Sequence, residues 1–385
     1  MESFNGERLK EARIFRGVTL VELSEKIGIT KQMISKYENA KAIPSFEILT
    51  KIIMYLNFPK EFFYEEDKVT VKIGNTYFRS LFTTSKREQQ RQQYPLKVIT
   101  SVKAVLDEYV DFPQLNLPEL VKDNKEMDRD IIEKSANDLR EFWGLNLDEP
   151  IHNMVQLLEK NGFIVSAFNI ESTDIDAFCR KQFVNGKDSY TISLAGNRFA
   201  VRRRFNAGHE LGHVILHESF IDLEEISKEQ HKRIEQEAHS FSSAFLLPKD
   251  AFIKDIGTHP TDLQNYIYYK RKWKVSISAM VIRAYNLGLI NNTQYQTLQR
   301  KINSNGWKKI EPLDKELGAE VPNVINQAIN LLIDNQILTG EELVKEISSF
   351  SGLSIYPEEI ERILGLKKGL LRKKDIENVV PLKIK

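Results

Sequence analysis

The sequence predicts a multidomain protein that is mainly α-helical and carries one small antiparallel β-sheet, an α+β fold. Its 385 residues exceed the usual size of one domain, so two or three hydrophobic cores are expected. Apolar residues recur at helical spacing in most segments, whereas strand-like alternation is found within residues 163–194. Hydrophobic residues at 41% and charged residues at 28% are ordinary for a globular chain.

Composition excludes several classes of protein. No apolar run approaches the roughly 20 residues that cross a bilayer, and no basic segment leads into an apolar one at the N-terminus. We therefore expect a cytoplasmic protein without membrane contact. The net charge of +1 gives no global basic field that would indicate nucleic acid. The single cysteine, Cys179, excludes an internal disulfide and a multi-cysteine zinc cluster, and we expect it to be buried in a strand.

The first sixty residues predict a bundle of short amphipathic helices. Thr19, Thr30 and Ser45 each precede a periodic run, where a side-chain oxygen can accept from a backbone amide of the first turn. A helix over 20–27, a turn at Gly28 and a helix over 31–39 have the size and spacing of a helix-turn-helix.

Roughly residues 6–66 resemble the XRE/Cro-type family of phage-repressor-like domains. The resemblance rests on Leu23, Ile27-Gly28, Ile34-Ser35 and Tyr37-Glu38-Asn39. It departs from the family at Leu20-Val21-Glu22, where many members carry Gln. By the docking geometry of such domains, the second helix enters the major groove of double-stranded operator DNA, usually as a homodimer. The expected DNA-contacting residues are Lys31, Gln32, Ser35 and Lys36. Protein binding or dimerisation is the alternative role.

Residues 67–127 are interpreted as a helical and basic linker region. After it, periodic apolar residues predict two helices over 128–158. Short alternating segments over 163–194 predict the antiparallel sheet, with Asn185-Gly186 as a hairpin turn.

A helix from about residue 200 to 218 carries the motif His209-Glu210-Leu211-Gly212-His213. Its two histidines lie one turn apart, so both imidazoles can bind one ion while Glu210 lies beside them. Zinc would activate water and polarise a carbonyl, and the carboxylate would take the proton of the water and pass it to the leaving amine. Gly208 and Gly212 inside this helix indicate that another backbone packs closely against it.

A tetrahedral zinc site needs a third protein ligand. A helix over 233–247, ended by Pro248, offers Glu235, Glu237 and His239. We select Glu237 because it shares a face with the apolar residues expected to pack on the motif helix, whereas Glu235 and His239 point away from that row. These apolar residues are Phe241, Ala244 and Phe245.

Residues 130–312 resemble the ImmA/IrrE family of zinc metallopeptidases. The resemblance rests on Trp143-Gly144-Leu145, Arg204-Phe205, the motif helix, Glu235-x-Glu237-Ala238, Leu246-Leu247-Pro248 and Trp273-Lys274-Val275-Ser276. It implies a zincin-like domain with His209, His213 and Glu237 on Zn2+ and Glu210 as general base. Members cleave partner repressors or are fused to a repressor-like domain. His239 stands where many members have Asn, so it remains an alternative metal-facing residue.

Together these observations predict four segments. They are a helix-turn-helix domain over 1–66, the linker region over 67–127, a metallopeptidase domain over 128–312 and a helical appendage over 313–385. The predicted function is a DNA-binding transcriptional regulator whose zinc-dependent endopeptidase domain cleaves itself or a partner repressor. The alternative is a non-catalytic repressor or antitoxin whose zinc domain senses a ligand or a protein partner.

Overall fold

The computed structural model describes residues 3–68, 71–78, 90–91, 93–119, 127–168, 176–184, 187–217 and 227–372. Its strands are β1 (Val71–Phe78), β2 (Ile164–Phe168), β3 (Ala177–Val184) and β4 (Lys187–Ala195). Its helices are α1 (Gly6–Phe15), α2 (Leu20–Ile27), α3 (Lys31–Glu38), α4 (Phe46–Leu56), the 3-10 helix η1 (Glu61–Phe63), α6 (Gln93–Leu106), α7 (Arg129–Phe142), α8 (Met154–Lys160), α9 (Ala200–His217), α10 (Lys228–Leu246), α11 (Lys249–Ile256), α12 (Leu263–Trp273), α13 (Ile277–Asn286), α14 (Asn292–Ser304), α15 (Val324–Asp334), α16 (Gly340–Ser351) and α17 (Pro357–Leu364). The predicted α+β class is confirmed.

Local capping explains the boundaries of the N-terminal helices. Thr19 accepts from the amide of Glu22, whose side chain accepts in return from the Thr19 amide, so α2 begins with a capping box. Gly28 ends α2 in the left-handed region at φ 75°, which glycine adopts without steric cost. Thr30 caps α3 by accepting from the amide of Met33. The helix predicted over 20–27 is therefore confirmed, and the second ends at residue 38.

The four strands form one sheet in the order β1-β3-β4-β2. β3 is antiparallel to both β1 and β4, but β2 runs parallel to β4. The prediction of a wholly antiparallel sheet is thus corrected to a mixed sheet. β4 lies between β3 and β2, and it runs in the same direction as β2. The predicted Asn185-Gly186 turn lies outside the described residues. Cys179 is buried in β3, as predicted.

The segment predicted as a linker contributes to the core. Residues 71–78 form the edge strand β1, and α6 buries apolar side chains along its length. The strand was missed because Gly74-Asn75 interrupts its pattern, and the β1–β3 register shifts at this place, between Ile73 and Thr76. The four predicted domain boundaries stay predictions.

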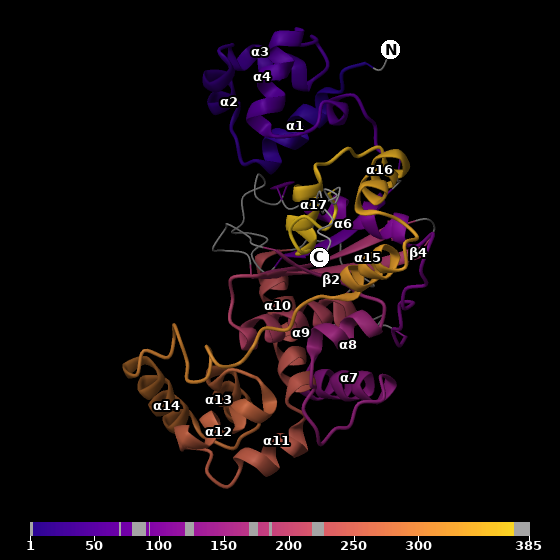
Figure 1. The fold of residues 1–385 in the computed structure, drawn as a ribbon. Coiled ribbons are helices and arrows are strands. Elements are labelled where there is room, and N and C mark those ends of the chain that lie inside the picture. The colour runs from indigo at the N-terminus through magenta and orange to yellow at the C-terminus, as the bar shows by residue number, and fades with distance from the viewer. Residues whose placement is uncertain are drawn as a thin grey trace, which may run out of the picture.

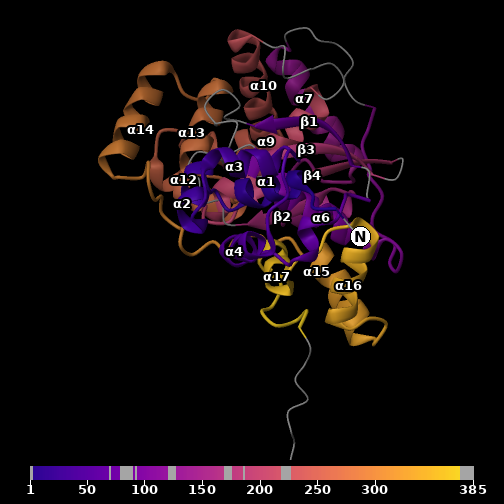
Figure 2. The ribbon, with the colours of Figure 1, turned by 90° about the horizontal axis from the view of Figure 1, so that it is seen from above.

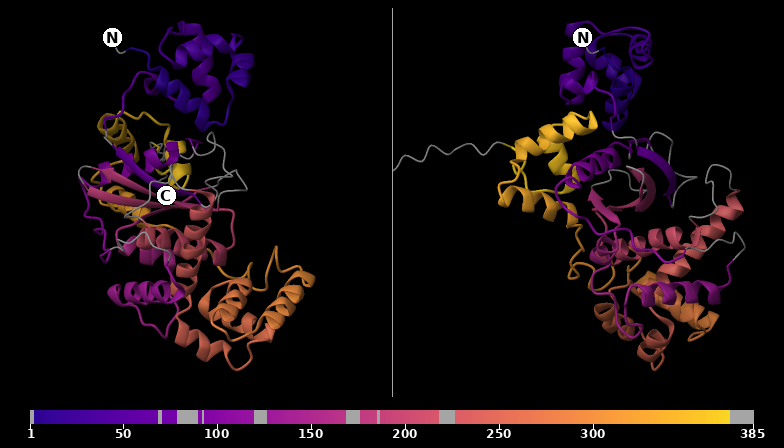
Figure 3. Two further views of the ribbon diagram at one scale, coloured as in Figure 1. Left: turned by 180° about the vertical axis from the view of Figure 1, so that it is seen from behind. Right: turned by 90° about the vertical axis from the view of Figure 1, so that its right-hand side faces the viewer.

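The sheet separates two hydrophobic cores. On one face, Cys179, Ile192 and Leu194 belong to the core that also contains residues of α7–α13. The other face is covered by α6 and α17, and Ile164 of β2 belongs to a second core shared by the N-terminal helices, α6 and α15–α17. Figure 3 shows the sheet between these two sets of helices.

The N-terminal helices pack against the C-terminal helices α15–α17, although these segments are far apart in sequence (Figure 1). The buried guanidinium of Arg8 donates to the carbonyl of Gly352 at 2.5 Å and pairs with Asp67 at 2.7 Å. Arg16 pairs with Glu359 of α17 at 3.2 Å. Helix α3 lies on the side turned away from the sheet, so these contacts leave its outer face uncovered.

Helices α12–α14 lie on the other side of the molecule from α15 and α16, as the view from above shows (Figure 2). Within the described residues, no helix is both long enough and apolar enough to cross a membrane.

Candidate metal centre and DNA-binding surface

Helix α9 carries the His-Glu-x-x-His motif and packs tightly against α10. A Cβ atom on Gly208 would lie 2.7 Å from the hydroxyl of Ser242. One on Gly212 would lie 3.1 Å from the backbone oxygen of Ala238, closer than most real Cβ contacts. The predicted close approach of another backbone to this stripe of α9 is confirmed.

Two buried histidines and a partly buried glutamate meet between α9 and α10. The Nε2 atoms of His209 and His213 lie 3.1 Å apart. The two carboxylate oxygens of Glu235 lie 3.3 Å from these nitrogens, one oxygen against each ring. We call His209, His213 and Glu235 the three-donor cluster. Its members come from adjacent turns of two packed helices, so the helix backbones hold the three groups together.

The structure corrects the sequence-based choice of Glu237 as the group beside the two histidines. The Glu237 carboxylate is buried, but it contacts His217 Nε2 at 3.0 Å and accepts from the amide of Met127 at 3.2 Å. The choice failed because α10 packs against α7 as well as α9, so its apolar row does not mark the face toward His209. Residues two positions apart on a helix lie about 200° apart around its axis, so Glu235 and Glu237 meet different histidines of α9.

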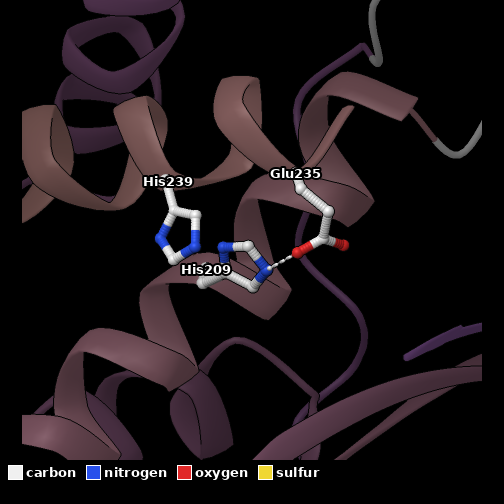
Figure 4. A group of neighbouring side chains, drawn as sticks. All are labelled: His209, Glu235 and His239. Carbon is white, nitrogen blue, oxygen red and sulfur yellow. Dashed lines mark ion pairs between the residues drawn. The ribbon is translucent and has the colours of Figure 1, made fainter. Parts of the chain in front are cut away.

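His239 flanks the cluster one turn beyond Glu235 (Figure 4). Its ring centroid lies 4.3 Å from that of His209, and it stacks on Phe205 at 5.8 Å. Ligand atoms of His209, Glu235 and His239 also lie within 4.8 Å of one another. Glu235 and His239 therefore both lie close to the motif helix, although the sequence places them away from the apolar row of α10.

The predicted DNA-contacting residues occupy the outer face of α3. Lys31, Gln32 and Lys36 are exposed. Ser35 is half-buried, and its carbonyl accepts from the side-chain amide of Asn39 at 2.7 Å. The opposite face of α3 buries Ile34 and Tyr37 against the other N-terminal helices, which leaves the polar face available to a partner.

Comparison with known proteins bears on both regions. Residues 9–63 match the helix-turn-helix family, and residues 159–285 match the IrrE N-terminal-like domain of the peptidase M78 family. The chain joins an XRE-type helix-turn-helix domain to an IrrE-like domain. It is also 39% identical over 57 residues to an uncharacterized HTH-type transcriptional regulator derived from the SPbeta prophage of Bacillus subtilis (strain 168). That match covers 15% of this chain, and the chain spans about half the length of that relative, 53%.

The peptidase M78 family, whose IrrE N-terminal-like domain residues 159–285 match, is generally metal-dependent. The donor set of the three-donor cluster fits a metal ion. A tetrahedral zinc ion with bonds of about 2.0–2.1 Å separates its donor atoms by about 3.3 Å, close to the 3.1–3.3 Å found here. Two imidazoles and one carboxylate are also a donor combination typical of catalytic zinc sites.

Electrostatics favours the protonation states that a metal requires. Burial lowers the pKa of His209 to about 3, against the opposing effect of its hydrogen bond with Glu235, so its imidazole is neutral at neutral pH. Burial acts to raise the pKa of Glu235, but hydrogen bonds from His209 and His213 outweigh it and hold that pKa below its ordinary value. The IrrE-like domain therefore presents a neutral imidazole and an ionised carboxylate, the forms that bind metal.

Glu210, the predicted general base, follows His209 directly in α9 and is 1% exposed. Its role as general base stays a prediction. The sequence underrated two other residues of the IrrE-like domain. Glu235 and His239 have the i, i+4 spacing of His209 and His213, which was the available signal for a second ligand-bearing stripe.

A third histidine of α9, His217, is also buried near the site. It is 2% exposed and lies two turns beyond His209 in α9. Burial lowers the pKa of His217 to about 4, with the hydrogen bond to Glu237 opposing that effect.

Proposed function

We propose that the protein is a transcriptional regulator whose IrrE-like domain is a zinc-dependent endopeptidase. The observation that carries the proposal is the three-donor cluster, because its donor atoms lie at zinc-like separations and the buried Glu210 follows His209 directly in α9. A purely structural zinc site usually has four protein ligands, whereas three ligands leave one position for water or substrate.

In this proposal His209, His213 and Glu235 hold the zinc ion. When bound, zinc supplies a Lewis acid that polarises the scissile carbonyl and activates water for attack. Glu210 accepts a proton from the attacking water and delivers it to the nitrogen of the leaving amine. Burial of the site limits access of bulk water and strengthens these charge interactions. Glu235 takes the ligand role that the sequence had suggested for Glu237.

We propose a repressor protein as the substrate, either this chain or a partner bound to the same DNA. The covalent link between the two domains supports this choice, because it raises the effective concentration of the peptidase near proteins on the operator. The DNA-binding role of α3 is supported by its exposed Lys31, Gln32 and Lys36. A homodimer would place two such helices about one DNA turn apart.

The substitution Glu210→Gln tests the enzymatic part of the proposal. It preserves the size of the side chain but removes the base, so cleavage of the substrate should fall by at least about 100-fold. Zinc content and operator binding should be retained, because in this proposal Glu210 neither binds the zinc ion nor contacts DNA. Cleavage is measured with purified protein and candidate repressors. The exposed Glu229, changed in the same way, is the matched control.

Induction in the cell separates the two functional alternatives. An endopeptidase predicts that Glu210→Gln and His209→Ala both abolish induction of the repressed genes. If Glu210→Gln induces like the parent and only His209→Ala fails, the zinc domain acts as a sensor without hydrolysis, and the enzymatic proposal is rejected.

A further inference from the structure

A continuous line of buried hydrogen bonds leads away from the three-donor cluster. His213 Nδ1 lies 3.2 Å from His217 Nδ1. The other ring nitrogen of His217, Nε2, lies 3.0 Å from Glu237 Oε2. The second carboxylate oxygen of Glu237 accepts from the amide of Met127 at 3.2 Å. The side chains of His217 and Glu237 are 2% and 7% exposed, so water competes little for these bonds.

The protonation pattern of this line follows from the use of His213 Nε2 toward a metal. A neutral imidazole that offers Nε2 as a lone pair carries its proton on Nδ1 and must donate from there. His217 then accepts at Nδ1 and carries its own proton on Nε2, which it donates to Glu237. His213 thus donates to His217, and His217 donates in turn to Glu237. The line ends on the Glu237 carboxylate, which accepts from His217 at one oxygen and from the amide of Met127 at the other.

We propose that His217 and Glu237 are positioning residues that orient His213, fix its tautomer and strengthen its bond to the metal. This inference rests on the proposed zinc site and extends it. A carboxylate reached through a histidine increases the electron density on the metal-binding ring, as direct carboxylate partners of ligating histidines do. It also gives Glu237 a role other than the ligand role expected from sequence.

The anchoring of Glu237 suits it to this task. The amide of Met127 holds one oxygen, and Arg233, one turn earlier in α10, has Nε 3.7 Å from the same oxygen. The carboxylate is therefore held between α10 and the segment entering α7. His217, one turn after His213 in α9, spans the distance from this anchor to the ligand.

Zinc affinity of the full-length protein tests the inference independently of peptidase activity. The dissociation constant is measured by competition with a chromophoric chelator for the parent, His217→Phe, Glu237→Gln and the double variant. We expect each single change to weaken zinc binding by about 10- to 100-fold, the range typical of residues that support a ligand. The exposed His259, changed to Gln, should leave the affinity unchanged.

The double variant decides whether the two residues act in series. Because Glu237 acts on His213 only through His217, the double variant should bind zinc as His217→Phe does, rather than with the two losses added. His217→Gln, which can still donate and accept, should recover part of the loss. The absorption spectrum of the Co2+ form should keep its four-coordinate intensity in Glu237→Gln, since no ligand is removed.

Three results would overturn the inference: additive losses, single variants that bind zinc as the His259 control does, or a Co2+ spectrum showing a lost ligand in Glu237→Gln. If His217→Phe fails to fold, the near-isosteric Glu237→Gln carries the test alone. A parent protein that binds no zinc would instead reject the proposed function, so the two failures are distinguishable.

Discussion

Glu235 and Glu237 show how much depends on which side of a helix a residue occupies. Both are glutamates on α10, and both accept hydrogen bonds from histidines of α9. Glu235 contacts the two motif histidines directly, while Glu237 contacts His217 on the far side of His213. The difference of about 200° around the helix axis thus separates a proposed ligand from a proposed support.

The first prediction concerns these two residues. Glu235→Ala should remove a ligand, so the purified protein should retain far less zinc than Glu237→Ala after dialysis against a weak chelator. Metal content is measured by mass spectrometry, with exposed Glu229→Ala as the control on the same helix. Equal zinc retention in the Glu235 and Glu237 variants would contradict the assignment of Glu235.

At the scale of elements, α3 combines a buried face with an exposed polar face. Its first turn is held by the Thr30 cap, so Lys31 and Gln32 stand at the end of the helix that such domains direct toward base edges. Glutamine can form two hydrogen bonds with adenine, whereas lysine contacts guanine or phosphate.

The second prediction is that Gln32→Ala weakens binding to the cognate operator by about 1–3 kcal/mol but changes non-specific binding little. Lys36→Ala should weaken binding to all sequences alike if Lys36 contacts phosphate. Anisotropy titrations at constant salt measure both effects, and Gln296→Ala on exposed α14 is the control. If Gln32→Ala still distinguishes the cognate operator from other DNA as well as the parent does, Gln32 does not contact the bases.

Elements with strong local signals could be predicted from the sequence. The helix over 20–27 was found at its observed bounds because its first and last turns are marked by Thr19 and Gly28. β1 could not be found, because its pairing with β3 depends on residues more than a hundred positions away and tolerates Gly74-Asn75 in the middle.

The part of the candidate site that lies on α9 could be predicted from a local motif. The part on α10 could not. In α9, His209 and His213 lie in a single motif whose spacing alone brings them together. In α10, the side that meets α9 is set by packing with α7, which no local pattern reveals. His217 and Glu237 come together only once these helices have docked.

At the scale of the whole molecule, the helix-turn-helix domain and the C-terminal helices share one hydrophobic core. Arg8 is central to this contact. Its guanidinium, over the ring of Phe62 at 5.0 Å, bonds to the carbonyl oxygens of Glu65 and Gly352 and pairs with Asp67. Loss of the cation would remove the hydrogen bond to the carbonyl of Gly352 and the link that joins α1 to this end of α16, although Asn5 still donates to Glu65 and Lys97 still pairs with Asp67.

The third prediction is that Arg8→Met lowers the free energy of unfolding by on the order of 3 kcal/mol, the cost of breaking a buried charged network. Lys10→Met, on the same helix and with a side chain that is 44% exposed, should change it by less than about 0.5 kcal/mol. Denaturant titration followed by circular dichroism measures both. Equal stability of the two variants would show that the contact of Arg8 with Gly352 contributes little.

The contact between Arg8 and Gly352 also has a consequence for biosynthesis. The two residues are 344 positions apart. At about 5–20 residues per second, a ribosome completes α1 roughly 17 to 70 seconds before it supplies this partner. The helix-turn-helix is therefore synthesised well before the C-terminal helices against which it packs. Until Gly352 has been added, the guanidinium of Arg8 lacks one of its hydrogen-bond acceptors, and the N-terminal helices lack the part of their core that α15–α17 supply.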